Sequence, residues 1–189
     1  MKTRAEAWQL LQAHMKDPAD LAHSRESEVI LRALARHLGQ DEERWGQLGL
    51  LHDIDWEYGV ETHCRKCREI LSAAGYDEAF VETVVSHGYG VPELGPELAA
   101  QKRTTPVQYC LAAGETLTGL IYATALVRPD KKLASVEVSS VKKKMKDKSF
   151  AAKVDRELIK ECELAGIPLD EFLAISLKAM QDIAGELGL

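Results

Sequence analysis

The chain has 189 residues, which fits one domain with a sizeable core, and its 46% hydrophobic content excludes a disordered chain. Its 30 acidic residues outnumber its 24 basic residues, so the net charge of −6 offers no general attraction for a nucleic-acid backbone. We therefore expect no nucleic-acid polymer as a partner, and an anionic substrate would need a local basic patch.

No stretch has the apolar length of a signal peptide or of a membrane span. We expect a cytoplasmic chain that makes no contact with a membrane, and in that reducing compartment its four cysteines are not expected to form disulfides. Cys64-Arg-Lys-Cys67 has the spacing of a redox or zinc motif. A second pair and a βαβ context are both missing, so a functional role for this pair is the less favoured interpretation.

The first long helix is predicted from Asp17-Pro18, a cap followed by proline at the first helical position, to Leu38 before Gly39. Its apolar stripe of Ile30, Leu34 and Leu38, followed backwards in helical steps, reaches Ser27 and His23. His23 is therefore expected to face the core.

A second helix is predicted after a cap at Asp41, and its pattern runs into His52-Asp53. Consecutive residues on a helix point about 100° apart, so this pair can reach one metal ion only where the backbone changes course. We place it at a helix end. Imidazole and carboxylate are ordinary metal ligands, although a buried histidine beside a capping aspartate would look the same.

Two further helices are predicted in the middle of the chain. One begins near Glu61 with His63 on its apolar stripe, and the other follows Asp77 with His87 at the end of its stripe. The stretch from Pro92 to Pro96 is expected to be a loop with at most a short helical turn.

A long helix is predicted from Pro106 to Arg128-Pro129, and Glu115 lies within it. No basic residue stands three or four positions from Glu115, so its carboxylate has no local salt-bridge partner. If it is buried, a cation is one candidate to offset the lost hydration.

The last part of the chain contains a basic stretch from Lys131 to Lys148 and then two amphipathic helices, over about 150–164 and 169–187. We see no repeat and no convincing set of strands. The sequence therefore predicts an all-α chain of roughly eight to ten helices, at one helical pattern per 15–20 residues.

Four histidines and two acids now stand in comparable places on five predicted helices. Each histidine alone is better explained by a core or edge position than by a ligand role, since histidine is a residue of intermediate burial. Burying all six groups without a shared purpose would be costly, and two metal ions bridged by Asp53 would use them all. These candidate metal ligands are His23, His52, Asp53, His63, His87 and Glu115.

The order His, His-Asp, His, His, acid on an all-helical chain resembles the HD-domain superfamily of metal-dependent phosphohydrolases, and more narrowly the small bacterial HDIG-type proteins. Local strings such as Leu48-Gly-Leu-Leu-His-Asp-Ile-Asp-Trp-Glu57 and Glu115-Thr-Leu-Thr-Gly-Leu-Ile121 carry the resemblance. It implies a single compact HD-type helical bundle over 1–189, with the core motif region at about 21–128 and C-terminal helices at about 139–187 packed on it.

By this resemblance, His23, His52, Asp53 and the acid at 115 match the four-ligand core site. His63 and His87 match the extra histidines of members that hold two metals. The family usually has aspartate where this chain has Glu115, and the extra methylene can shift or weaken the site. The implied cofactor is one or two divalent ions, of iron, manganese, cobalt or magnesium.

The leading function implied is hydrolysis of a small phosphoester, for which we expect a nucleotide. Metal ions would polarise the phosphoryl group and activate a water molecule. Asp53 would bridge the ions, and Asp55 and Glu57 would orient the water or protonate the leaving group, unless they are solvated loop residues. The basic stretch, through Arg128, Lys132 and Lys143, would receive the phosphate, unless it is a solvated surface run.

Two other functions remain open. A histidine-rich site of six ligands also resembles the HD-fold oxygenases that use two irons, because imidazole suits iron better than magnesium. The third possibility is a non-catalytic module that binds a metal or nucleotide, which only Glu115 favours. The substrate, the metal and the oligomeric state do not follow from the sequence.

Overall fold

Polar caps in the sequence set where the first three helices begin. Thr3 forms a capping box with Glu6 at the start of α1, Asp17 accepts the backbone N–H groups of Ala19 and Asp20 at the start of α2, and Asp41 accepts that of Arg44 at the start of α3. Such caps satisfy donors that have no partner within the helix. These three boundaries agree with the capping signals of the sequence.

The structure is a computed structural model that describes residues 2–188. Its α-helices are α1 (Arg4–His14), α2 (Pro18–His37), α3 (Glu42–Leu51), α4 (Lys66–Ala73), α5 (Glu78–Val85), α6 (Pro96–Ala99), α7 (Pro106–Leu126), α8 (Val138–Lys146), α9 (Arg156–Lys160), α10 (Leu169–Gln181) and α11 (Ala184–Leu187). Short 3₁₀ helices lie at η1 (Trp56–Tyr58), η2 (Ser86–Gly88), η3 (Pro92–Leu94), η4 (Leu133–Ser135) and η5 (Glu161–Ala165).

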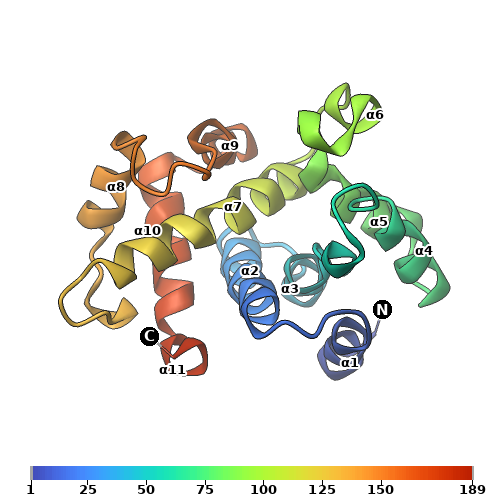
Figure 1. Ribbon diagram of the computed structural model, residues 1–189, viewed down its shortest axis with the longest axis horizontal. Coiled ribbons are helices and arrows are strands. Elements are labelled where there is room, and N and C mark those ends of the chain that lie inside the picture. The colour runs from blue at the N-terminus through green and yellow to red at the C-terminus, as the bar shows by residue number, and fades with distance from the viewer. Residues whose placement is uncertain (1, 189) are drawn as a thin grey trace.

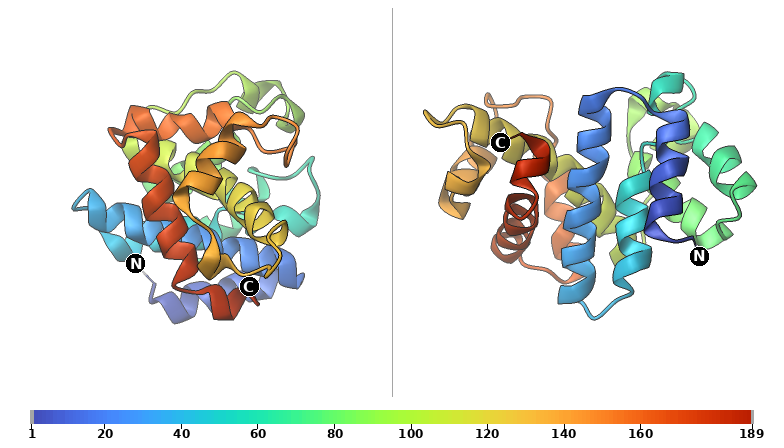
Figure 2. Two further views of the ribbon diagram at one scale, coloured as in Figure 1. Left: turned by 90° about the vertical axis from the view of Figure 1, so that its left-hand side faces the viewer. Right: turned by 90° about the horizontal axis from the view of Figure 1, so that it is seen from below.

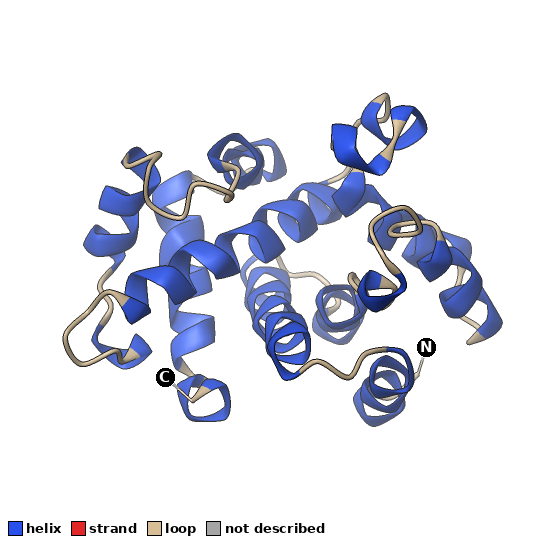
Figure 3. Ribbon diagram, in the orientation of Figure 1, coloured by secondary structure: helices blue, strands red, loops and turns tan. Residues whose placement is uncertain are grey.

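Residues 2–188 contain no strand, and the prediction of an all-α chain is confirmed (Figure 3). The eleven α-helices slightly exceed the expected eight to ten, because α6 and α11 are single turns of four residues.

Two predicted helices are shorter than expected. The helix expected from Glu61 begins only at Lys66, and the one expected from about residue 150 begins only at Arg156. Cys64 and Ala151 have φ values of 61° and 45°, in the left-handed region, which ends a right-handed helix. The intervening residues form turns.

Helix α7 crosses the molecule, and a group of helices lies toward each of its ends (Figure 1). Toward its start lie α4, α5 and α6, and toward its end lie α8, α10 and α11. Helices α1, α3 and α2 lie side by side below α7, with α3 in the middle (Figure 2).

The buried hydrophobic residues form two clusters. The first joins α2 and α7 to the C-terminal helices, through residues such as Leu34, Leu117 and Phe172. The second joins α1, α3, α4 and α5, through residues such as Leu51 and Phe80. The C-terminal helices thus pack on α2 and α7, while the prediction that residues 1–189 form a single domain stays a prediction.

In the described part of the chain, no helix is both long enough and apolar enough to cross a membrane.

Candidate metal centre

His23 lies on the second turn of α2 and faces α7. Its Nδ1 is 3.0 Å from the Oγ1 of Thr118, and this hydroxyl donates its own proton to the carbonyl of Glu115 at 2.6 Å. The hydroxyl therefore accepts from His23, which assigns the proton to Nδ1 and leaves the Nε2 lone pair free.

His52 and Asp53 follow the last residue of α3, where the chain leaves the helix. His52 is completely buried, and its Nδ1 donates to the carbonyl of Gly49 at 2.8 Å. The Nε2 atoms of His52 and His23 are 3.1 Å apart. Because the backbone turns here, His52 and the adjacent Asp53 point to the same centre.

His63 lies in the turns before α4 and not on a helix, so its predicted place on a helical stripe is wrong. Its Nδ1 bonds the Oδ1 of Asp55 at 2.8 Å, while the Oδ2 of Asp55 accepts the backbone N–H of Cys67 at 2.7 Å. Asp55 therefore orients the His63 ring from behind.

His87 lies on η2, which continues from the end of α5 at Val85. Its Nδ1 donates to the carbonyl of Val84 at 2.6 Å, and its Nε2 is 3.1 Å from the Nε2 of His63. The predicted stripe is correct in direction, although the α-helix ends two residues earlier.

Asp53 lies between the two pairs of histidines, with one carboxylate oxygen toward each pair. Its Oδ2 is 3.3 Å from the Nε2 of His52 and 3.6 Å from that of His23. Its Oδ1 is 3.3 Å from the Nε2 of His87 and 3.6 Å from that of His63. The structure thus brings all four histidines around one carboxylate.

Glu115 completes the pair formed by His23 and His52. Its Oε2 is 4.0 Å from the Nε2 of His23, and its Oε1 accepts a hydrogen bond from Thr116 at 2.6 Å. Ligand atoms of His23, His52 and Glu115 all lie within 4.8 Å of one another, as do those of His63, Cys64 and His87.

The chemistry of these donors fits divalent cations. All four Nδ1 atoms have oxygen acceptors, so the four Nε2 lone pairs face a carboxylate and each other. Two bare lone pairs 3.1 Å apart repel, and a proton or a metal ion between them removes the repulsion. Neutral imidazoles whose outer nitrogen is held by an oxygen are the usual form of histidine ligands in metal sites.

The electrostatics of the two halves differ. Burial and the neighbouring His52 lower the pKa of His23 to about 4, which keeps it neutral. Burial also lowers the pKa of His63, but the hydrogen bonds to Asp55 and Cys64, together with nearby negative charge, outweigh burial and raise that pKa to about 9. A cation bound near His63 therefore has to displace a proton.

The pKa values of the two acids, Asp53 and Glu115, are shifted in opposite directions. Burial alone would raise the pKa of Asp53, but His52 and His87 hold it well below its usual range. Burial raises the pKa of Glu115. Asp53 is thus a carboxylate already ionised for binding, while Glu115 gains its charge most easily when a cation is present.

Glu57, predicted as a catalytic residue beside Asp55, points away from the centre. Its Oε1 accepts the backbone N–H groups of Lys16 and Asp17 at 2.5 and 2.7 Å, which ties this loop to the start of α2. Asp55 is fully buried and both of its oxygens are engaged. Their catalytic roles remain untested predictions.

A cavity of about 690 Å³ opens onto His23, His63, His87 and Asp53, while His52 is buried behind them. It is lined by Asp20, Trp56, Glu93, Lys153 and Leu158, among others. Arg128, Lys132 and Lys143, predicted to receive a phosphate, do not line it. Leu126, where α7 ends just before Arg128, is eleven residues from Glu115, or about 16 Å along the helix axis. The Nε of Arg128 binds the Oγ of Ser135 instead, at 2.6 Å.

Sequence reasoning missed Lys153 and Asp20, which line this cavity, and Cys64, which is buried behind it beside His87. Cys64 had a signal, because it follows a candidate ligand directly in the chain. Lys153 had none, since it lies far along the chain in a turn that the helical pattern did not predict.

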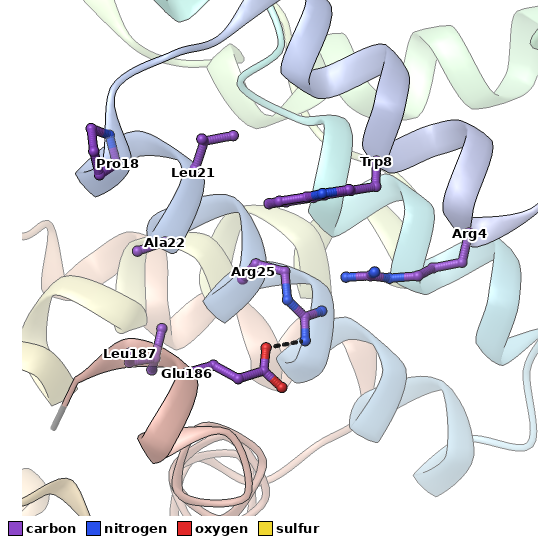
Figure 4. A pocket seen from close by; sticks show the side chains of 8 residues that line it. All are labelled: Arg4, Trp8, Pro18, Leu21, Ala22, Arg25, Glu186 and Leu187. Carbon is purple, nitrogen blue, oxygen red and sulfur yellow. Dashed lines mark hydrogen bonds and ion pairs between the residues drawn. The ribbon is translucent and has the colours of Figure 1, made fainter.

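A separate cavity of about 460 Å³ lies between α1, α2 and α11 (Figure 4). The ring of Trp8 and the guanidinium groups of Arg4 and Arg25 surround it, and Arg25 pairs with Glu186 at 2.9 Å. No histidine or cysteine lines it, so the cation chemistry belongs to the first cavity.

Residues 20–111 match the family model described as the HD domain. The matched range contains five of the six candidate ligands and stops four residues before Glu115. A comparison with curated proteins finds no match, and neither does a comparison with solved structures.

Proposed function

Because this chain belongs to the HD-domain superfamily, we propose that it is a metal-dependent phosphohydrolase acting on a small phosphoester, with a nucleotide as the expected substrate. The observation that carries the proposal is the convergence of four Nε2 lone pairs on Asp53, with every Nδ1 held by an oxygen.

The six ligand residues divide into two positions that share Asp53. His23, His52 and Glu115 would hold one divalent ion, and His63 and His87 would hold the other. Ions bound there polarise a phosphoryl oxygen and lower the pKa of a bound water molecule. Asp55 acts as a positioning residue, because it keeps the His63 ring and its Nδ1 proton in place.

Two groups at the cavity are suited to the substrate. Lys153 is the basic residue that lines the cavity and is exposed, so it can meet a phosphate that enters from solvent. Burial, Asp17 and Asp53 raise the pKa of Asp20, which favours the protonated form that a leaving oxygen needs. The cavity can also enclose the rest of a nucleotide against Trp56 and Leu158.

The test is phosphate release from a panel of nucleotides and simple phosphoesters, with Mn²⁺, Fe²⁺, Co²⁺ or Mg²⁺ supplied. Asp53→Asn removes the charge between the two positions and is expected to abolish turnover while the helical circular dichroism stays unchanged. Asp182→Asn, an equal change at an exposed site, is expected to keep full activity. Release that survives both Asp53→Asn and chelation contradicts the proposal.

The imidazole-rich donor set favours a second candidate, a di-iron oxygenase, because nitrogen ligands suit iron better than magnesium. Consumption of dioxygen by the iron-loaded protein with an organic substrate, together with no phosphate release, would support it. Metal binding without either reaction would support the third possibility, a non-catalytic module that binds a metal or nucleotide.

A further inference from the structure

Cys64 lies beside the two histidines that have no glutamate partner. It follows His63 directly, it is fully buried, and its Sγ is 3.5 Å from the Nε2 of His87. The thiol thus points toward the nitrogen that also approaches Asp53.

The space for this sulfur depends on Gly88. A Cβ at that position would lie 2.6 Å from the Sγ of Cys64 and 2.7 Å from the Cδ1 of Leu94. Cys64 also holds a φ of 61°, which is unfavourable for a residue with a side chain. The local backbone and the neighbouring glycine together place the sulfur against the histidines.

We infer that Cys64 is a ligand of the cation held by His63, His87 and Asp53, so that this position contains sulfur. The inference rests on the metal site of the proposed function. Atoms bound to one ion at about 2.0–2.3 Å with near-tetrahedral angles lie roughly 3.3–3.6 Å apart.

The observed separations fit such a set. They are 3.1 Å between the Nε2 atoms of His63 and His87, 3.5 Å from the sulfur to His87, and 3.3 and 3.6 Å from Asp53 to the two imidazoles. Three of the four separations lie within the expected range, and the fourth is slightly shorter.

The other thiols of the chain have no such surroundings. Cys67, Cys110 and Cys162 are buried, and burial raises the pKa of Cys110 and Cys162 to about 12. Neither of these two has a histidine contact among the described residues. Cys110 and Cys162 therefore resemble the unreactive thiols of a hydrophobic core, whereas Cys64 contacts His87.

The two cation positions therefore differ in what they select. His23, His52, Glu115 and Asp53 supply only nitrogen and oxygen, which suit manganese and iron. A thiolate beside two imidazoles favours zinc, cobalt or iron and disfavours magnesium. We expect metal ions to occupy the two positions unequally, and the position that contains Cys64 to retain thiophilic metals.

The test uses cobalt(II) as a coloured probe on the metal-free full-length protein. The wild type is expected to bind two equivalents, one of which develops a thiolate-to-cobalt charge-transfer band in the near ultraviolet. Cys64→Ser is expected to lose this band and to bind the second equivalent roughly tenfold or more weakly. Cys110→Ala, the matched loss of a buried thiol, is expected to keep both.

Two binding equivalents without the band in the wild type, or a band that persists in Cys64→Ser, would overturn the inference and leave the proposed metal site intact. A wild type that binds no cobalt stoichiometrically would remove the proposed site together with the inference. Should Cys64→Ser not fold, X-ray absorption of the zinc-loaded wild type decides the matter, since a metal shell without sulfur contradicts the inference.

Discussion

His63 differs from the other three histidines in the group that holds its outer nitrogen. His52 and His87 donate to backbone carbonyls and His23 to a hydroxyl, whereas His63 donates to the carboxylate of Asp55. An anionic acceptor makes an imidazole more basic and fixes its orientation. The position that contains His63 is therefore the one most dependent on a residue, Asp55, that would contact neither the ion nor the substrate itself.

Asp55→Asn tests this dependence. The amide can no longer offer two acceptor oxygens, so either His63 or the backbone N–H of Cys67 loses its partner. The second equivalent of metal is expected to bind about 10–100-fold more weakly, and the first equivalent to be unchanged. Calorimetric titration measures both, and an equal loss at the two positions would contradict a specific effect on His63.

Glu26, on α2 one turn from His23, is 4% exposed, and burial raises its pKa to about 7. The unfolded chain releases this proton near pH 4.5, whereas the folded chain keeps it up to about pH 7. The unfolded state therefore binds fewer protons between these values, and the free energy of unfolding falls as the pH rises through this range.

Glu26→Gln removes the titrating carboxyl group and with it the loss of stability at high pH. The metal-free variant is expected to exceed the wild type in stability by roughly 3 kcal/mol at pH 8, and the difference should nearly vanish near pH 4.5. Urea denaturation at several pH values measures it. Glu163→Gln, a change at an exposed position, serves as control, and a difference that does not vary with pH would disprove the assigned pKa.

At the scale of helices, most boundaries could be predicted because their signals are local. Asp17-Pro18 and Gly39 delimit α2, Asp41 caps α3, and Pro106 begins α7. These residues act on the backbone next to them, so the sequence alone contains the information.

The failures at this scale depend on contacts made only in the folded chain. The first residues of the helix expected from about residue 150 form a turn instead. The guanidinium of Arg156 donates to three backbone carbonyls of this turn, those of Phe150, Ala151 and Val154. No pattern in the sequence reveals that an arginine will supply these partners. Lys153 reaches the cavity from the same turn, so its position could not be predicted either.

In the candidate metal centre, too, local features could be predicted from the sequence and contacts of the folded chain could not. The sequence reveals His23 and His87 on apolar stripes and His52-Asp53 at a helix end, whereas it does not reveal the partners that orient them. The sequence leaves Asp55 as either a catalytic acid or a solvated loop residue, whereas the structure places it buried beneath His63. Such pairings arise from turns whose backbone the pattern of apolar residues does not specify.

The close packing of α2 against α3 sets the distance between His23 and His52. A Cβ on Gly49 would lie 2.5 Å from the backbone oxygen of Ser27 and 2.9 Å from the backbone nitrogen of Glu28. Backbone atoms cannot rotate away, so a larger residue has to push the two helices apart.

Gly49→Ala is therefore expected to destabilise the fold by about 1–3 kcal/mol and to weaken metal binding at the His23 and His52 position. Gly119→Ala is the matched control, because its Cβ would meet only Val154 at an ordinary 3.5 Å and alanine favours a helix. Thermal denaturation and metal titration measure the two effects. Equal stability of the two variants would show that α2 and α3 are not in tight contact.

At the scale of the whole molecule, the candidate metal centre lies where the two hydrophobic clusters meet. His52 directly follows Leu51 and His87 lies two residues after Val85, both in the second cluster, while α2 and α7 carry the first. Val107 on α7 packs against both clusters. Bound ions would thus join elements that are far apart in the chain, with Asp53 at the junction.

Metal binding is accordingly expected to stabilise the entire chain. The ligands come together only in the folded state, so ions at a thousand times their dissociation constant add about 4 kcal/mol to the free energy of unfolding. For a chain of this size that raises Tm by roughly 10 °C. Differential scanning calorimetry with Mn²⁺ or Co²⁺ and then with excess chelator measures the change. Asp53→Asn should melt at one temperature under both conditions, because it lacks the carboxylate shared by the two positions. The contrary result is a wild-type Tm that does not change with metal at concentrations where titration shows full occupancy. It would mean that the ions bind the unfolded chain as tightly as the folded one, so that the fold does not create the metal centre from these six residues.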